Sequence, residues 1–228
     1  MVPVPATRDE GIRLGRAWFP MVGGALGLVA GAVGLGVARV TSRELGAVAA
    51  MASLALLTGA LHLDGLMDSA DGLLGGWNRE QRLEIMRDPR AGAFGVVAVA
   101  LLLLAQFAIL AALPPDRWLV ALVAAGAVSR WCALGVLVAL PYARPEGLGV
   151  SWSGGHRALD LAIGTVVVAP LAWVGGLRAV LGLGLAGLGA LGVAALAMRR
   201  VGGATGDVYG AVVEVCQLLA LAAFVVRM

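Results

Sequence analysis

Long apolar runs recur along the chain and constrain its fold more than any other feature. A membrane-spanning helix needs about 20 largely apolar residues, and no stretch between the runs is long enough to bury a soluble core of its own. The 228 residues are 60% hydrophobic and only 14% charged, with a mean hydropathy of +0.92. We therefore predict one integral membrane domain, 1–228, with an all-α fold: a polytopic transmembrane helix bundle with about seven spanning helices. The expected spans are 18–37, 45–62, 93–113, 118–140, 159–175, 177–198 and 208–226.

The helix count depends on two places in this pattern. The second run continues directly into an acidic stretch, and only Gly175-Gly176 with Arg178 separates the fifth run from the sixth. Six or eight helices therefore fit the same pattern. The 34 glycines let membrane helices approach closely. The oligomeric state stays open, with a homo-oligomer among the alternatives.

Arginine is distributed unevenly over the predicted loops. Cytoplasmic loops of membrane proteins are enriched in Arg and Lys, and a cytoplasmic N-terminus puts eleven arginines inside and five outside. This orientation gathers the three longest polar connections, 63–91, 141–158 and 199–207, on the cytoplasmic side. The inside arginines are 8, 13, 16, 79, 82, 87, 90, 144, 157, 199 and 200, and the outside ones are 39, 43, 117, 178 and 227.

The composition also bounds the partners. Lysine is absent, so the net charge of +3 comes from arginine, which is compatible with a phosphate or phospholipid partner. We expect the lipid bilayer as a partner and no nucleic acid. Cys132 and Cys216 both lie inside apolar runs, where thiols act as small hydrophobes, so neither a disulfide nor a zinc site is expected.

Three carboxylates follow the second apolar run. Asp64, Asp68 and Asp71 stand at i, i+4 and i+7, which places them on one narrow stripe of a helix. Their mutual repulsion calls for a cation, and carboxylate oxygens suit Mg²⁺, which fills its other positions with phosphate oxygens and water. We predict a magnesium and phosphate site here. The alternative is a solvated loop whose acids merely face water.

An amphipathic segment with four arginines comes next, from Trp77 to Gly92. Its Arg82, Asp88 and Arg90 are candidate substrate-binding residues, because guanidinium groups bind phosphate bidentately. The alternative is a set of ordinary surface pairs, each contributing a few tenths of a kcal/mol.

Other charges stand inside or beside the later runs. Arg130 lies mid-run, so it should face the bundle interior and meet an acid or a phosphate; Glu214 is a candidate partner. Asp160 near a helix start is assigned a structural role. The loop with Gly203, Thr205, Gly206 and Asp207 precedes a helix whose first N–H groups favour anions, and Asp207 is a further candidate metal ligand.

Taken together, these motifs resemble the cobalamin synthase family of adenosylcobinamide-GDP ribazoletransferases over nearly the whole chain. One position departs from the expected pattern, because Gln217 stands where a second acid is expected after Glu214. The motifs that carry the resemblance are FPMVG from Phe19, HLDGLMDSADGLLGGW from His62, RLEIMRDPRAGAFG from Arg82, Ser129-Arg130, PYARPEG from Pro141 and GGATGDVYGAVVE from Gly202.

The resemblance implies a reaction and a role for each candidate site residue. Cobinamide phosphate would pass from adenosylcobinamide-GDP to the ribose hydroxyl of α-ribazole or its 5′-phosphate, with release of GMP and with Mg²⁺ as cofactor, at the bacterial cytoplasmic (inner) membrane. Association with other nucleotide-loop assembly enzymes is a further expectation. The implied metal ligands are Asp64, Asp68, Asp71 and Asp207, the catalytic residues Asp68 and Asp71, and the substrate-binding residues Arg82, Asp88, Arg90, Arg130, Arg144, Gly203, Thr205 and Gly206.

Two other classes remain as alternatives. A CDP-alcohol phosphotransferase also uses aspartates on membrane helices, but the order of its motif differs from the order here. A transporter or channel could use acids and a mid-membrane arginine, but these acids cluster with arginines and glycines at one face.

Overall fold

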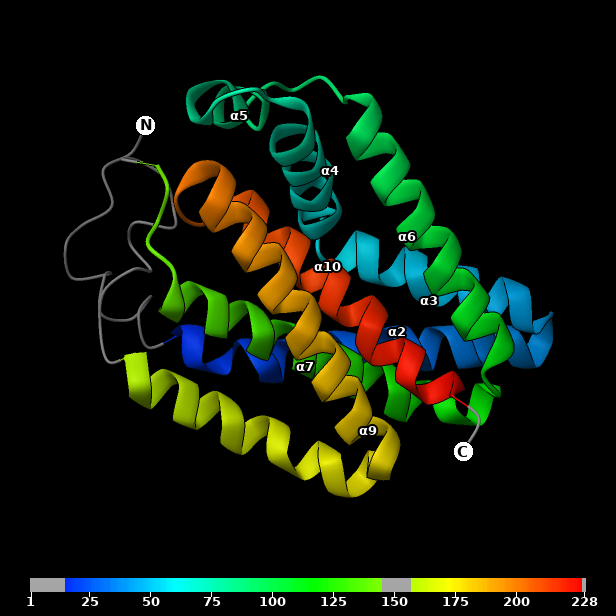
Figure 1. The fold of residues 1–228 in the computed structure, drawn as a ribbon. Coiled ribbons are helices and arrows are strands. Elements are labelled where there is room, and N and C mark those ends of the chain that lie inside the picture. The colour runs from blue at the N-terminus through cyan, green and yellow to red at the C-terminus, as the bar shows by residue number, and fades with distance from the viewer. Residues whose placement is uncertain (1–14, 145–156, 227–228) are drawn as a thin grey trace, which may run out of the picture.

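Helices make up nearly all of the described chain. In this computed structural model, which describes residues 15–144 and 157–226, there is no strand, only an isolated bridge between Tyr142 and Ala204. The elements are η2 (Arg16–Trp18), α2 (Phe19–Val40), α3 (Arg43–Leu57), α4 (Leu61–Gly75), α5 (Arg79–Ile85), α6 (Ala93–Ala112), η3 (Pro115–Arg117), α7 (Trp118–Ala139), α9 (Arg157–Val201), α10 (Gly206–Ala222) and η4 (Ala223–Val225) (Figure 1).

The all-α membrane fold is confirmed, but the count of about seven spans is not. Within residues 15–144 and 157–226, five helices are long and apolar enough to cross a membrane, and a sixth span results only if α3 and α4 are taken together. The five are Arg16–Val40, Ala93–Ala112, Pro115–Ala139, Trp173–Val201 and Gly206–Val225.

The predicted second span, 45–62, breaks at its C-terminal end. Helix α3 ends at Leu57, and the chain then takes left-handed φ values of 58° at Gly59 and 56° at Ala60. Helix α4 begins at Leu61 and runs at 85° to α3. With 15 residues, or ~22 Å of helix, α4 is too short to cross a bilayer alone, and it lies outside the five spans.

The predicted fifth and sixth runs form the two arms of α9. The backbone at Gly176 has φ 58° and ψ −150°, so the helix bends where Gly175-Gly176 predicted a boundary. The first arm contains only a shorter apolar helix, Ala158–Leu171, whereas the second is long enough to span. The short first arm of α9 and the break after α3 explain why five spanning helices are found where about seven were predicted.

Helices α7 and α10 form the centre of the bundle. Their most apolar windows are 72% and 67% buried, whereas the windows of the other three spanning helices are only 22–28% buried. Large apolar side chains such as Trp173 and Leu188 are exposed on the outer helices. An apolar outer surface of this kind suits lipid rather than water.

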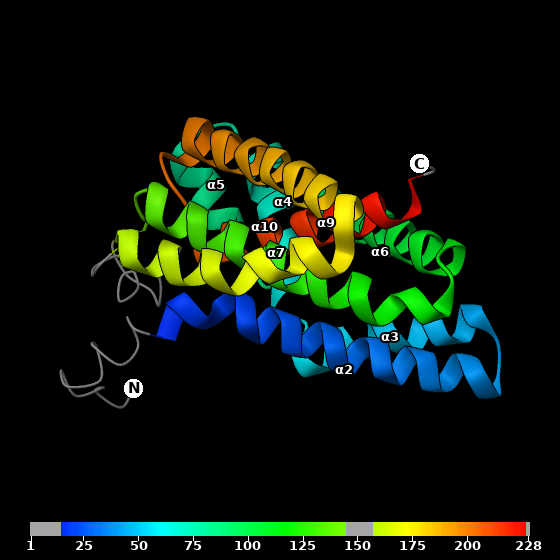
Figure 2. The ribbon, with the colours of Figure 1, turned by 90° about the horizontal axis from the view of Figure 1, so that it is seen from below.

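Glycine brings the helix backbones together. Helix α2 runs alongside α7 (Figure 2), and Gly23 packs directly on the Gly126 carbonyl and on Cδ of Arg130. At the other close crossing, a Cβ on Gly65 of α4 would lie 2.8 Å from the Asp207 carbonyl oxygen and 3.1 Å from Cα of Gly210 in α10. Neither crossing has room for a side chain, as expected where no hydrophobic effect drives helices together.

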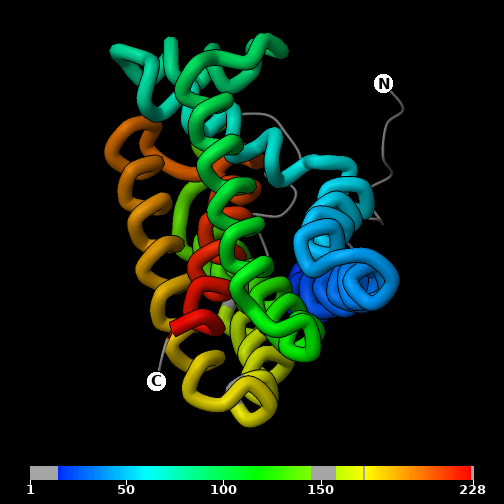
Figure 3. Tube along the Cα trace, turned by 90° about the vertical axis from the view of Figure 1, so that its right-hand side faces the viewer, coloured from blue at the N-terminus to red at the C-terminus, as the bar shows by residue number. Residues whose placement is uncertain are grey.

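The described parts of the polar connections gather at one end of the bundle, as predicted, and residues 145–156 of the connection 141–158 lie outside the described residues. Arg79 after α4 reaches the Ala143 and Val201 carbonyls, and Arg144 reaches Asp207. The turn between α6 and α7, Arg178 and the end of η4 line a common cavity at the opposite end, where the bend of α9 also lies (Figure 3). Which end faces the cytoplasm stays a prediction. Of the arginines counted for orientation, Arg8, Arg13 and Arg227 lie outside the described residues.

The structural role predicted for Asp160 is confirmed, and it has a partner that its position did not indicate. Asp160 lies in the first turn of α9 and accepts a 2.6 Å hydrogen bond from Nε of Arg16. Both side chains are almost fully buried. The pair ties the start of α9 to the segment that precedes α2.

The glycine contacts generate a stability prediction. Gly23→Ala should lower the free energy of unfolding by about 1–3 kcal/mol, because the methyl group has no space against α7 and the backbones must move apart. Unfolding in mixed detergent micelles, followed by tryptophan fluorescence, measures this change.

Gly36→Ala is the matched control on the same helix, because nothing lies within 4 Å of its Cβ position. It should leave stability within about 1 kcal/mol of the parent. Equal stabilities for the two variants would contradict the packing argument.

Candidate active site

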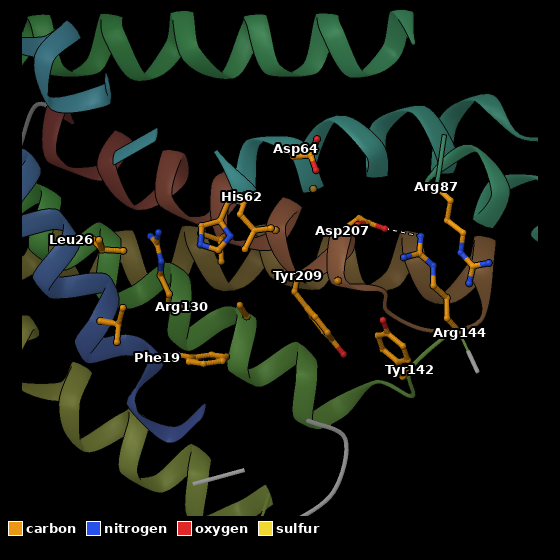
Figure 4. Close-up of a pocket in the computed structure, with 17 residues that line it drawn as sticks. Phe19, Leu26, His62, Asp64, Arg87, Arg130, Tyr142, Arg144, Asp207 and Tyr209 are labelled. Carbon is orange, nitrogen blue, oxygen red and sulfur yellow. Dashed lines mark hydrogen bonds and ion pairs between the residues drawn. The ribbon is translucent and has the colours of Figure 1, made fainter. Parts of the chain in front are cut away.

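A cavity of about 750 Å³ opens between α2, α4, α7 and α10. Figure 4 shows that its charged side chains come from separate parts of the chain. Of the predicted site residues, those that line it are Asp64, Arg130, Arg144, Gly206 and Asp207; His62, Arg87, Tyr142 and Tyr209 also line it. Several motifs far apart in the sequence thus share one cavity.

The crossing of α4 and α10 brings Asp64 and Asp207 to this cavity. Gly65 and Gly210 let the two backbones touch, and each lies close in sequence to one of the acids. At the start of α10 the Thr205 hydroxyl accepts the Val208 N–H as an N-cap and lies 3.1 Å from Oδ2 of Asp207. Nη2 of Arg144 donates to the same Oδ2 at 2.8 Å. Asp207 is therefore held in place, whereas Asp64 is exposed.

The glycine-rich loop before α10 is shaped by backbone contact. Gly202 has φ +77°, and Gly203 packs directly on the Pro141 carbonyl. The Ala204 N–H donates to that carbonyl at 2.9 Å, and the Ala143 N–H donates to the Ala204 carbonyl at 2.8 Å. Among the predicted substrate-binding residues of this loop, Gly206 lines the cavity, whereas Gly203 and Thr205 are buried and are not among the residues that line it.

Arg79 holds these connections together, a role that sequence reasoning missed. Its Nε donates to the Val201 carbonyl at 2.9 Å and its Nη2 to the Ala143 carbonyl at 2.8 Å. One arginine thereby satisfies the C-terminal end of α9 and the segment after α7. The sequence gives no signal for this role, because the partners are backbone groups 64 and 122 residues away.

The three acids of α4 have different surroundings. Asp64 lines the cavity and Asp68 is partly buried. Burial, together with the charges of Asp64, Asp207 and Asp71, raises the pKa of Asp68 to about 6 against the opposing effect of Arg144. Within the described residues, no three His, Cys, Asp or Glu side chains group closely enough to hold a metal ion by themselves.

Asp71 is used as a helix cap. Its Oδ2 accepts the Gly92 N–H and its Oδ1 accepts the Gly95 N–H, each at 2.8 Å. These N–H groups belong to the first turn of α6, where free donors and the helix dipole favour a carboxylate. Asp71 is buried and is not among the residues that line the cavity.

The other predicted arginines divide between interior and surface. Arg82 is buried, and its Nε lacks a hydrogen-bond partner among the described residues. Arg90 is 86% exposed and pairs with Asp88 at 2.6 Å; these hydrogen bonds hold the pKa of Asp88 at about 2. This is a surface pair of the ordinary kind that the alternative for this segment describes, although the pairing of Asp88 with Arg90 was not predicted, whereas Arg87 of the same segment lines the cavity.

Arg130 faces the bundle interior, as predicted. Its Nη1 donates to the Gln217 side-chain oxygen at 2.6 Å and to the Ser129 hydroxyl at 3.0 Å. Glu214 interacts with it electrostatically and accepts a weak 3.4 Å hydrogen bond from Gln106. Gln217, the position that departs from the expected pattern, thus orients Arg130.

Comparison with known proteins identifies the family. The family model described as cobalamin-5-phosphate synthase matches residues 1–225. The chain belongs to this family. It is similar to the adenosylcobinamide-GDP ribazoletransferase of Bradyrhizobium diazoefficiens, with 44% identity over 87% of this chain and 80% of the relative. The Ralstonia pickettii protein of the same name is 41% identical, with coverage of 96% and 89%, and the Klebsiella pneumoniae protein is 37% identical, with 97% and 94%. No solved structure matches.

Membership of the cobalamin-5-phosphate synthase family confirms the resemblance seen in the motifs. The curated relatives carry the name of a transferase, which favours an enzyme over a transporter or channel. In this member of the family, the motifs that begin at His62 and Gly202 meet at the α4–α10 crossing.

The contacts of Asp71 yield a prediction that separates capping from catalysis. Asp71→Ala should lower the free energy of unfolding by about 1–3 kcal/mol in the absence of any substrate or metal, because two N–H groups of α6 lose their acceptor. Asp64→Ala on the same helix should change it by less than about 0.5 kcal/mol, because Asp64 is exposed. Chemical unfolding in detergent compares the two, and an unchanged stability for Asp71→Ala would contradict the capping role.

Proposed function

We propose that this chain transfers the cobinamide phosphate group of adenosylcobinamide-GDP to the ribose hydroxyl of α-ribazole, or of its 5′-phosphate, and releases GMP. The observation that carries the proposal is the cavity lined by Asp64, Asp207, Arg87 and Arg144, in a chain whose relatives bear the name of this transferase. We place the reaction at the bacterial cytoplasmic membrane, with the cavity facing the cytoplasm because the arginine-rich connections surround it. A homo-oligomer and association with other nucleotide-loop assembly enzymes stay predictions.

The reaction sets three requirements. The ribose oxygen forms a bond to the phosphorus next to cobinamide, the bond from that phosphorus to the bridging oxygen breaks, and GMP leaves. The hydroxyl proton must pass to a base, and the charge on the pyrophosphate must be neutralised. Binding also has to hold the hydroxyl in line with the leaving oxygen.

The acids of the cavity suit Mg²⁺. Asp64 and Asp207 offer carboxylate oxygens, and Mg²⁺ is commonly bound by one or two carboxylates with substrate phosphates and water as the remaining ligands. The repulsion that raises the pKa of Asp68 is the kind that a cation relieves. We propose that Asp64 and Asp207, the two carboxylates that line the cavity, hold the ion, which when bound would neutralise charge on the pyrophosphate.

Arginines are the second source of positive charge. Asp207 holds Arg144 at the rim of the cavity through a 2.8 Å contact, and Arg87 lines the same wall. We assign these two guanidinium groups to the phosphate oxygens of the donor. Arg82, Asp88 and Arg90 do not line the cavity, so their assignment to substrate depends on movement of the α5 segment.

A carboxylate would accept the hydroxyl proton. We assign this role to Asp68, the acid of α4 that is neither assigned to the ion nor bonded to the start of α6. We place Asp71 as a positioning residue, since both of its oxygens accept N–H groups of α6. It sets the end of α6 beside the acids of α4.

The test is GMP release from adenosylcobinamide-GDP and α-ribazole by the detergent-purified protein. We expect release to require Mg²⁺ and to be coupled to formation of adenosylcobalamin. Asp64→Asn should lower kcat at least about 100-fold, because it removes a charge that would face the ion.

Asp116→Asn provides the matched control. Asp116 is an exposed aspartate in η3, at the end of the bundle opposite the cavity, and its replacement should leave turnover unchanged. Equal activity in both variants would exclude Asp64 from the site. Absence of GMP release by a folded sample would reject the proposed reaction, and the same assay with CDP-alcohol donors would then test the nearest alternative.

A further inference from the structure

The cavity has two chemically different ends. Asp207, Arg144, Arg87 and Tyr142 lie toward one end in Figure 4, and Phe19, Leu26, His62 and Arg130 lie toward the other, with Asp64 and Tyr209 between them. Besides Phe19 and Leu26, apolar lining comes from Val22, Ala133 and Val213. A substrate that fills the cavity must therefore combine an apolar part with a strongly anionic or hydroxyl-bearing part.

The apolar end contains one oriented cation. Arg130 is only 6% exposed, and Gly23 leaves room for its side chain to pass along α2. Its hydrogen bonds with described residues both leave from Nη1, and Arg130 is one of the residues that line the cavity. Nε and Nη2 can therefore donate to a ligand.

We infer that this apolar end binds the aromatic base of the acceptor and that Arg130 donates a hydrogen bond to the base nitrogen that carries no ribose. The inference rests on the proposed function and adds the orientation of α-ribazole to it. A dimethylbenzimidazole is a flat, apolar bicycle with a single acceptor nitrogen in its plane. A wall of aliphatic and aromatic side chains, with Arg130 as a buried donor beside the His62 ring, matches that chemistry.

The other parts of the two substrates match this end less well. Guanine presents several donors and acceptors along its edge, and a corrin carries amide groups around its rim. Apolar walls would leave most of these groups without partners, at a cost for each. The base at the Arg130 end directs the ribose toward Asp64 and Asp207, where the hydroxyl must react, and leaves the arginine-lined end for the pyrophosphate.

Ala133→Leu tests the inference, because it fills the apolar end without changing charge. The KM for α-ribazole should rise at least about tenfold, and the KM for adenosylcobinamide-GDP should stay unchanged. For the riboside of unsubstituted benzimidazole the rise in KM should be smaller, because this riboside lacks the two methyl groups that the new side chain would displace. An equal rise in KM for both ribosides, or a rise only in the KM for adenosylcobinamide-GDP, would overturn the inference.

Two controls complete the experiment. Ala139→Leu, at an exposed position of the same helix that does not line the cavity, should change neither KM. Calorimetry of α-ribazole binding in the absence of adenosylcobinamide-GDP tests the base site independently of the proposed transfer reaction. Binding that Ala133→Leu weakens would support the base site even if the wild type releases no GMP, whereas binding that Ala133→Leu leaves unchanged would overturn the base site even if the wild type turns over.

Discussion

The site depends on the contact between α4 and α10, where two glycines allow one backbone to lie against the other. A Cβ on Gly65 would lie 2.8 Å from the carbonyl oxygen of Asp207, so the crossing that packs the helices also sets the distance between the acids. In lipid, such contacts replace the hydrophobic effect as the source of helix association. A glycine in this position is therefore both a packing residue and a determinant of the site.

Several of the charges hold the helices in place rather than line the cavity. Asp71 accepts two N–H groups of α6, Arg79 donates to two carbonyls, and Arg16 pairs with Asp160 at the start of α9. Helix ends leave four donors or acceptors without intrahelical partners, and in a membrane protein those groups are costly to leave unmet. The polar residues at this end of the bundle thus divide between holding the helix ends and lining the cavity.

Arg130 connects the interior of the bundle to the cavity. Gln217 and Ser129 fix one nitrogen of its guanidinium, and Glu214 compensates its charge. A neutral amide at position 217 can accept that hydrogen bond without adding a second buried carboxylate. The cation is therefore oriented, and it still faces the space that α2, α7 and α10 enclose.

The sequence by itself determined the membrane class, most of the spanning helices, the interior position of Arg130 and the candidacy of Asp64 and Asp207, because apolar run length and local charge spacing carry that information. Only the tertiary structure decided that the predicted second span breaks between α3 and α4, at Gly59 and Ala60. It also decided that Asp71 caps α6 and that Arg87, rather than Arg82 or Arg90, lines the cavity. Helical spacing put Asp64, Asp68 and Asp71 on one stripe, but their partners come from helices distant in the chain. Periodicity describes one helix at a time, whereas the role of a charge depends on which neighbouring helix end it meets.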